Sequence, residues 1–469
     1  MTAASLKKGF TLPVLLGGLL LFISSSRPVF SAETTPQELI PFLVLASLAV
    51  CLITLVNTNF GLSVLIFSML LSPEIEAFKT PRQAVVVRID DFLIGAVFLT
   101  WMAKMAIFKG AALFRATPLN RPMISYLAIC LFSTLIAMLN KSISGPAPFF
   151  FLLKYLEYYL LFFMFLNNVQ TRKQIQNFLT CLMITGVIVC IYALSLYGIM
   201  ERLTGPFEGG NPQPASLGGF LLVLISCLLG FLGYPTWPKH RFLILVPLGL
   251  ALTTLWLSLS RGALTGFIAL YLVAILLPSR GRIGLVFLLV LVIILGAAFT
   301  PARIFDFLRA TFIETPAGGG VFQVGGLEVE LGPSPAGRVM QYQWVLQEWM
   351  KNPLIGYGVT GVGLVDSQYL LVVGETGFIG SCIFLWLLVR IFQAGISAFR
   401  EGQDPFAKAL GMAFLLASTG IVVQGLTANS FIIVRIMEPF WFLAAMTVGV
   451  MQLQEEAPAT ARDASPAVR

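Results

Sequence analysis

The chain has 469 residues, of which 57% are hydrophobic and 11% are charged, with a formal net charge of +8. Soluble domains carry about 25% charged residues. The composition therefore excludes a soluble enzyme, a disordered chain, a coiled coil and a secreted disulfide scaffold. It predicts an all-α, polytopic integral membrane protein with about 12–14 transmembrane helices and one large extracytoplasmic loop containing short helices.

Candidate membrane spans follow from the length of the apolar segments. A bilayer core of about 30 Å requires roughly 20 apolar residues per helix. The predicted spans, in chain order, are residues 10–23, 37–56, 59–72, 90–108, 122–139, 149–166, 177–197, 215–234, 242–259, 262–278, 283–300, 367–392, 406–427 and 434–453. The first span follows Lys7 and Lys8 and imitates a signal peptide, but Phe30 stands where cleavage needs a small residue, so we expect an uncleaved helix.

The distribution of charge predicts the orientation of these spans. With the N-terminus in the cytoplasm and the spans alternating, the cytoplasmic side carries a net charge of +12 and the rest of the chain −4, which together give the formal +8. This is the positive-inside pattern of a membrane protein with both termini in the cytoplasm. The basic balance therefore reports topology, and no nucleic-acid partner is predicted.

The predicted organisation has four parts. Residues 1–300 form transmembrane helices 1–11, residues 301–366 form a large periplasmic loop, residues 367–453 form transmembrane helices 12–14, and residues 454–469 form a disordered cytoplasmic tail. Within the loop, Ser334 and Pro335 predict the start of a helix, and Asn352-Pro353 predicts its end. We expect this helix to lie across the membrane surface or to cap a cavity.

The loop helix should be amphipathic. One stripe is apolar, whereas the opposite face is polar. The apolar stripe comprises Val339, Tyr342, Leu346 and Trp349, and the polar face comprises Arg338, Gln341, Glu348 and Lys351. A glycine-rich stretch at residues 356–363 follows, and it predicts tight turns where the chain re-enters the membrane.

Two acidic residues lie near the start of the following span. Asp366 and Glu375 would cost a few kcal/mol there unless they were paired or faced a water-filled cavity. Asp366 is also explained as a helix cap, and Glu375 as the partner of a nearby arginine. Deeper in a span, Lys154 and Glu157 are expected to form a structural internal pair.

Several arginines are predicted on the same outer face. Each alone could extend to lipid headgroups. Together they suit a lipid-linked phosphate or diphosphate, because guanidinium groups bind phosphate oxygens bidentately and remain charged. A carboxylate beside them could accept the proton of a hydroxyl nucleophile. The arginines predicted in outer loops or at span ends are Arg202, Arg261, Arg303, Arg309, Arg338 and Arg435.

From residue 258 onward the chain resembles the O-antigen ligase and polymerase superfamily of bacterial envelope glycan enzymes. Ordered segments carry the resemblance. They are Leu257-Ser-Leu-Ser-Arg-Gly262, Gly337-Arg338 with Trp344, Trp349-Met-Lys-Asn-Pro-Leu-Ile-Gly-Tyr-Gly358, Asp366-Ser-Gln-Tyr-Leu370 and Glu375-Thr-Gly-Phe-Ile-Gly380, with an upstream Gly205-Pro-Phe-Glu-Gly-Gly-Asn-Pro212.

The resemblance implies a metal-independent glycosyl transfer at the periplasmic face, without a cofactor. The donor would be a glycan on undecaprenyl diphosphate in the lipid bilayer, and the acceptor a sugar hydroxyl. Arg261 and Arg338 would bind the diphosphate, with Arg202 or Arg303 assisting. Flippase and chain-length regulator proteins would be its partners.

One departure from the family bears on the reaction. Ligases of this family carry a His-Asn pair where this chain has Asp366-Ser367, and the only histidine, His240, is predicted in a cytoplasmic loop. We therefore expect an inverting glycosyltransferase that polymerises repeat units of a surface or exported polysaccharide, with Asp366 as the catalytic base and Glu375 as the second candidate. A ligase that transfers glycan to a lipid or protein acceptor, a lipid-linked glycan flippase and a non-catalytic assembly scaffold are the alternatives.

Overall fold

The structure is a computed structural model that describes residues 53–54, 57–72, 74–79, 84–108, 115–200, 202–208, 213–234, 242–277, 282–287, 320–324, 327–331, 333–363 and 365–463. Most of this part of the chain is helical. The helices are α4 (Thr58–Leu71), α5 (Ile89–Phe108), α6 (Asn120–Leu139), α7 (Ala147–Asn168), α8 (Arg172–Ser195), α9 (Pro214–Gly233), α10 (Phe242–Leu257), α11 (Arg261–Leu276), α14 (Pro333–Lys351), α15 (Gln368–Glu401), α16 (Pro405–Gln424) and α17 (Val434–Asp463).

The helices confirm a polytopic membrane fold. Among the described residues, 7 helices are long and apolar enough to cross a membrane: α6, α7, α8, α9, α15, α16 and α17. Helices α4, α10 and α11 are apolar but shorter. Each predicted span from 59–72 to 262–278, and from 367–392 to 434–453, coincides with a helix. Span 10–23 and most of spans 37–56 and 283–300 lie outside the described residues.

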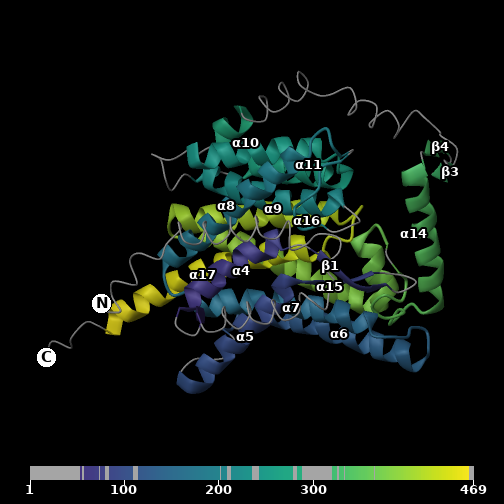
Figure 1. Ribbon diagram of the computed structural model, residues 1–469, viewed down its shortest axis with the longest axis horizontal. Helices are drawn as coiled ribbons and strands as arrows, with labels where there is room; N and C mark the ends of the chain where they lie inside the picture. Colours follow the sequence, from purple (N-terminus) through teal and green to yellow (C-terminus); the bar gives the residue numbers. More distant parts are fainter. Residues whose placement is uncertain are drawn as a thin grey trace.

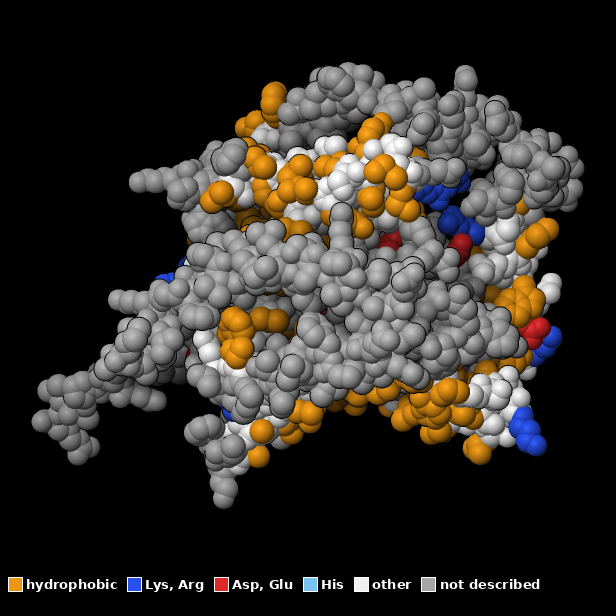
Figure 2. Space-filling view, in the orientation of Figure 1, with side chains coloured by type: hydrophobic (Ala, Val, Ile, Leu, Met, Phe, Trp, Pro, Cys, Tyr) orange, Lys and Arg blue, Asp and Glu red, His pale blue; other side chains and the backbone are white. Residues whose placement is uncertain are grey.

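The helices form a layered bundle, and α14 lies across its ends (Figure 1). Helices α10 and α11 form one outer layer, α8, α9, α16 and α17 lie in the middle, and α5, α6 and α7 form the opposite layer. The surface over α6 is largely hydrophobic (Figure 2), because Ile124, Phe132 and Leu139 point outward. This is the surface that a membrane protein presents to lipid tails.

The centre of the bundle is the contact between α9 and α16. Almost every residue of α9 is buried. Small residues allow the two helices to approach closely: a Cβ added at Gly230 would lie 2.4 Å from the backbone oxygen of Ala409. Such close approach of helix backbones is the main packing device inside membranes, where lipid tails remove most of the hydrophobic driving force.

Two antiparallel hairpins add strands that the all-α prediction did not contain. Strand β1 (Glu74–Lys79) pairs with β2 (Ala84–Arg88), and β3 (Gly320–Val324) pairs with β4 (Leu327–Leu331). Both lie in loops between predicted spans. The alternation in Leu-Glu-Val-Glu-Leu of β4, and the glycines at 325–326, are hairpin signals that the sequence does contain.

Helix α15 breaks near its beginning. Gly377 has φ of 63°, a left-handed conformation that glycine adopts without strain. The break leaves backbone groups that pair with the loop at residues 353–363: the N–H of Tyr357 donates to Gly374 O (2.9 Å), and the N–H of Phe378 donates to Pro353 O (2.8 Å). The glycine-rich stretch therefore makes tight turns against α15, as predicted.

The end of one helix differs from the sequence prediction, and the limits of another are close to it. Helix α17 continues to Asp463, although a disordered tail was expected from residue 454. Helix α14 begins at Pro333 and ends at Lys351, close to the predicted limits. Its predicted apolar stripe is only partly correct, because Leu346 is 42% exposed whereas Val345 is fully buried. Helix α14 packs on α15 and on the loop before it. The residues of α14 that face these segments are therefore the buried ones.

Candidate functional site

A pocket of about 300 Å³ lies between α14 and the ends of the bundle helices. Segments far apart in the chain form it, and they bring together three of the predicted arginines and one predicted acid. The lining residues are Arg202, Gln213, Pro214, Ala215, Leu259, Ser260, Arg261, Gly262, Arg338, Asp366, Thr427, Ala428 and Asn429. In the space-filling view, basic and acidic side chains meet between α14 and the bundle (Figure 2).

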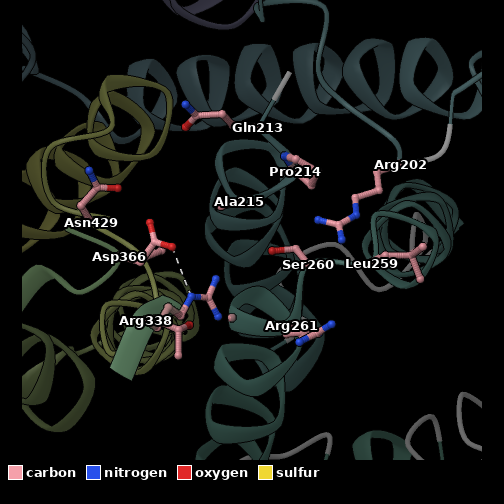
Figure 3. A pocket seen from close by; sticks show the side chains of 13 residues that line it. Arg202, Gln213, Pro214, Ala215, Leu259, Ser260, Arg261, Arg338, Asp366 and Asn429 are labelled. Carbon is pink, nitrogen blue, oxygen red and sulfur yellow. Dashed lines mark hydrogen bonds and ion pairs between the residues drawn. The ribbon is translucent and has the colours of Figure 1, made fainter. Parts of the chain in front are cut away.

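The turn between α10 and α11 presents Ser260 and Arg261 to the pocket. Leu259 has φ of 54°, which costs a non-glycine residue about 1–3 kcal/mol and recurs at functional sites. The hydroxyl of Ser258 donates to Leu255 O (2.8 Å) and closes the end of α10. Arg261 is the first residue of α11, so its side chain lies where that helix begins, at the pocket (Figure 3).

Arg338 and Asp366 form an ion pair on the opposite wall. The Nε of Arg338 lies 3.2 Å from Oδ2 of Asp366, and the Asp366 side chain is 58% exposed (Figure 3). An ion pair this open contributes little to stability. Asp366 therefore remains accessible to a ligand, with its orientation set by an arginine.

Helix α14 also positions the backbone around Asp366. The N–H of Asp366 donates to Oε1 of Gln341 (3.0 Å). The hydroxyl of Tyr342 donates to Asp366 O (2.9 Å) and lies 3.2 Å from Leu426 O. Burial raises the pKa of the Tyr342 hydroxyl, with a further contribution from the Asp366 charge, so the phenol stays protonated as a donor. Arg338 and Gln341 from the predicted polar face of α14, and Tyr342 from its predicted apolar stripe, are thus the residues that contact Asp366.

Positive charge predominates in the pocket. Arg202 and Arg338 lie close enough to repel the Arg261 guanidinium. One carboxylate, Asp366, accompanies these three guanidinium groups among the lining residues. Arg202 projects from the loop before α9 toward the side of the pocket that holds Ser260 and Arg261 (Figure 3). An anion with several oxygens, such as a diphosphate, would relieve the repulsion.

Glu375 does not line this pocket. It is 3% exposed, and its Oε1 accepts a hydrogen bond from the N–H of Thr360 (2.7 Å). The backbone oxygen of Glu375 accepts from the N–H of Gly358 (2.8 Å) and from the hydroxyl of Ser133 (2.6 Å). The structure thus separates the two predicted acids: Glu375 anchors the glycine-rich loop, and Asp366 faces the pocket.

Two other residues of the sequence prediction cannot be placed. Arg303, the assisting arginine, and His240, the only histidine, lie outside the described residues. Glu157 is placed, but its contact is with Arg88 (3.5 Å), whereas Lys154 lies over the Phe151 ring. The contact between Arg88 and Glu157 is long-range, and spacing along one helix could not reveal it.

Uncharged polar residues of the pocket were not predicted. Gln213 and Asn429 lie at its edges, opposite Arg261 (Figure 3). The N–H of Gln213 donates to Oε2 of Glu208 (2.6 Å), which ties the start of α9 to the loop that carries Arg202. The sequence holds a weak signal for both: Gln213 directly follows the Asn211-Pro212 motif, and Asn429 begins a short polar run after a predicted span.

Comparison with known protein families matches one region of the chain. Residues 246–385 match the model of the O-antigen ligase family. The matched region includes Arg261, Arg338 and Asp366, while Arg202 and Asn429 lie outside it. No curated protein matches the chain. The match over residues 246–385 supports the predicted resemblance to the O-antigen ligase and polymerase superfamily of membrane glycan-processing proteins.

Proposed function

We propose that this protein is a glycosyltransferase that polymerises undecaprenyl-diphosphate-linked repeat units of a surface or exported polysaccharide. The observation that carries the proposal is the pocket itself, where Arg202, Arg261 and Arg338 surround Asp366. The guanidinium groups suit the diphosphate of a lipid-linked donor. A solvent-accessible carboxylate suits a general base for the acceptor hydroxyl.

The proposed transfer needs the donor, the acceptor, Asp366 and the arginines of the pocket. The acceptor hydroxyl oxygen attacks the anomeric carbon of the donor sugar, and its proton passes to a carboxylate oxygen of Asp366. The bond between the anomeric carbon and the diphosphate oxygen breaks, and undecaprenyl diphosphate leaves. Attack from the face opposite the leaving group inverts the anomeric configuration. The arginines stabilise the negative charge that develops on the departing diphosphate.

We place the reaction at the periplasmic face of the bacterial inner membrane. Support comes from the charge pattern: with a cytoplasmic N-terminus, the basic inner loops follow the positive-inside rule. Under the same topology the loops that carry Arg202, Arg338 and Asp366 face outward. A diphosphate held at the helix ends is also at the depth where the headgroup of a lipid-linked donor lies.

Transfer to a different acceptor is the second candidate function. It is favoured by the family description, which names a ligase. Polymerisation is favoured by the residues, because Asp366-Ser367 stands where ligases of this family carry His-Asn. The lipid-linked glycan that accumulates in a deletion strain distinguishes them. A single repeat unit supports polymerisation, and full-length undecaprenyl-linked polymer supports the ligase.

Complementation of that deletion strain tests the pocket. We expect Asp366→Asn, Arg261→Ala and Arg338→Ala to abolish long glycan chains on a gel at wild-type protein levels. Matched controls come from Asp404 and Arg172, an ion pair remote from the pocket. Asp404→Asn keeps an oxygen that can accept from the Ala407 N–H and cap α16. Full polymer from all three well-expressed pocket variants would contradict the proposal.

A further inference from the structure

A second cluster of charged residues is buried in the bundle, apart from the pocket. It joins the start of α5, the middle of α7 and the start of α17, and none of its members lines the pocket. Its members are Arg88, Asp90, Asp91, Glu157, Arg435 and Glu438. We propose that this acidic cluster binds a divalent, oxygen-preferring cation such as Mg²⁺ or Ca²⁺, which ties α17 to α5 and α7.

The arginines of the cluster are directed at the two aspartates. Arg88 donates from Nε (3.2 Å) and Nη2 (2.8 Å) to Oδ1 of Asp91. Arg435 donates from Nη1 to Oδ2 of Asp90 (3.1 Å), and from Nη2 to Ser72 O (2.6 Å). Arg88 also lies 3.5 Å from Oε2 of Glu157, but the two positive charges balance only two of the four carboxylates. Two negative charges remain, and burial without compensation is costly.

The spacing of the carboxylates suits one shared ion. Asp90, Asp91 and Glu157 each offer an oxygen, and these oxygens lie within 4.8 Å of one another. Ionised carboxylates grouped this closely repel one another unless a proton or a cation lies between them. Oxygen donors of this kind are the ligands that Mg²⁺ and Ca²⁺ prefer.

Glu438 is the independent observation that points to a ligand. It is 0% exposed, and no described residue hydrogen-bonds either of its carboxylate oxygens. It lies within electrostatic range of Asp90, Arg88 and Glu157. A proton on Glu438 would remove its charge but leave the carboxyl group without a hydrogen-bond partner. A hydrated cation supplies both the charge and water donors to these oxygens.

The cluster also has a side from which an ion could enter. Asp91 is 27% exposed and Glu157 is 11% exposed, whereas Arg88, Asp90 and Glu438 are nearly inaccessible. A bound ion would fix the start of α17, directly after the segment that places Ala428 and Asn429 in the pocket. The site is therefore structural, and it does not depend on the proposed transfer reaction.

Manganese binding to the purified full-length protein tests the proposal. The protein is treated with EDTA, exchanged into chelator-free buffer and titrated with Mn²⁺, and bound ion is measured by electron paramagnetic resonance. We expect one Mn²⁺ per chain, displaced by Mg²⁺ or Ca²⁺. Glu438→Gln and Glu157→Gln should each weaken binding at least tenfold, whereas Asp366→Asn should leave it unchanged.

Thermal unfolding provides a second measurement that does not require activity. EDTA should lower the Tm of the wild type and Ca²⁺ should restore it, with neither effect in Glu438→Gln. No stoichiometric Mn²⁺ binding by folded wild type, or a Tm unmoved by EDTA and Ca²⁺, would overturn the proposal in favour of bound protons. Binding that is lost in Asp366→Asn but kept in both glutamate variants would also overturn it, because the ion would then occupy the pocket.

Discussion

The pocket and the acidic cluster use the same residue types with opposite balance. In the pocket, three arginines surround one carboxylate, and Asp366 and Arg338 remain open at 58% and 30% exposure. In the acidic cluster, four carboxylates surround two arginines, and Arg435 and Glu438 are almost completely buried. Excess positive charge at an open site favours an anionic ligand, whereas excess negative charge at a closed site must be neutralised by a bound cation or by protons.

The energetic consequences differ as much as the charges. An exposed ion pair contributes about 0–1 kcal/mol to folding, so the pocket residues can be replaced at small cost in stability. Removing one partner of a buried pair costs about 3–5 kcal/mol, because an uncompensated charge remains. Variants of the pocket should therefore lose reaction, and variants of the acidic cluster should lose stability.

The largest expected effect is on transfer by Asp366→Asn. The amide cannot accept the acceptor-hydroxyl proton, so we expect the rate to fall about 10²–10⁴-fold, with the Tm within a few degrees of wild type. The measurement is extension of the lipid-linked glycan extracted from a deletion strain, by purified protein in nanodiscs. A rate within threefold of wild type would remove Asp366 from the reaction.

Loss of a pocket arginine should come next. Arg261→Ala and Arg338→Ala remove charge stabilisation of the leaving diphosphate, and we expect a decrease of about 10²–10³-fold in kcat/KM. Arg261→Lys should recover only part of it, because lysine lacks the bidentate geometry. The control is Arg172→Ala, which should stay near wild type; an equal loss there would point to a general effect of arginine removal.

In the acidic cluster, Arg435→Met should lower stability and leave transfer largely intact. Asp90 would keep its charge without its partner at 3.1 Å, so we expect destabilisation of about 3–5 kcal/mol. The readout is the Tm of the purified protein, with transfer per folded molecule largely retained. Unchanged stability would show that the buried charges are compensated in another way.

Variants of Glu375 distinguish it from Asp366 as the candidate base. Glu375→Gln keeps an oxygen for the Thr360 N–H and should behave as wild type, whereas Glu375→Ala should cost about 1–3 kcal/mol, because a buried donor loses its partner. Both variants should transfer glycan within threefold of wild type per folded protein. If Glu375→Gln eliminated transfer while Asp366→Asn did not, the base would be Glu375.

Tyr342→Phe should have the smallest effect. It removes one hydroxyl that contacts the backbone oxygens of Asp366 and Leu426, a loss of about 1 kcal/mol or roughly fivefold in rate. Steady-state kinetics at saturating donor would detect it. A loss as large as that of Asp366→Asn would instead assign the phenol a direct part in the reaction.

The pocket and the acidic cluster differ in how far the sequence predicts them. In a chain with 11% charged residues, the few charges predicted on the outer face were conspicuous, so Arg202, Arg261, Arg338 and Asp366 could be proposed before the structure joined them. Spans were predictable because apolar length is a local property. The hairpin of β3 and β4 also has a local signal, the alternation of apolar and acidic residues in β4, although no strand was predicted there.

Other features had no local signal. The Arg435–Asp90 pair joins residues 345 positions apart, and nothing in either neighbourhood indicates the other. Glu375 was predicted at the site because it follows Asp366 closely in the chain. The break at Gly377 and the hydrogen bonds of loop 353–363 decide its true position. Tertiary contacts of this kind are beyond what spacing along the chain can report.

We propose that the arginine-lined pocket binds the lipid diphosphate and that Asp366 activates the acceptor. The most direct test measures donor binding and product formation together, with the purified protein and the lipid-linked glycan from the deletion strain. The claim predicts that Asp366→Asn binds donor as wild type does but forms no product, and that Arg261→Ala loses both. Wild-type product formation by both variants would contradict it.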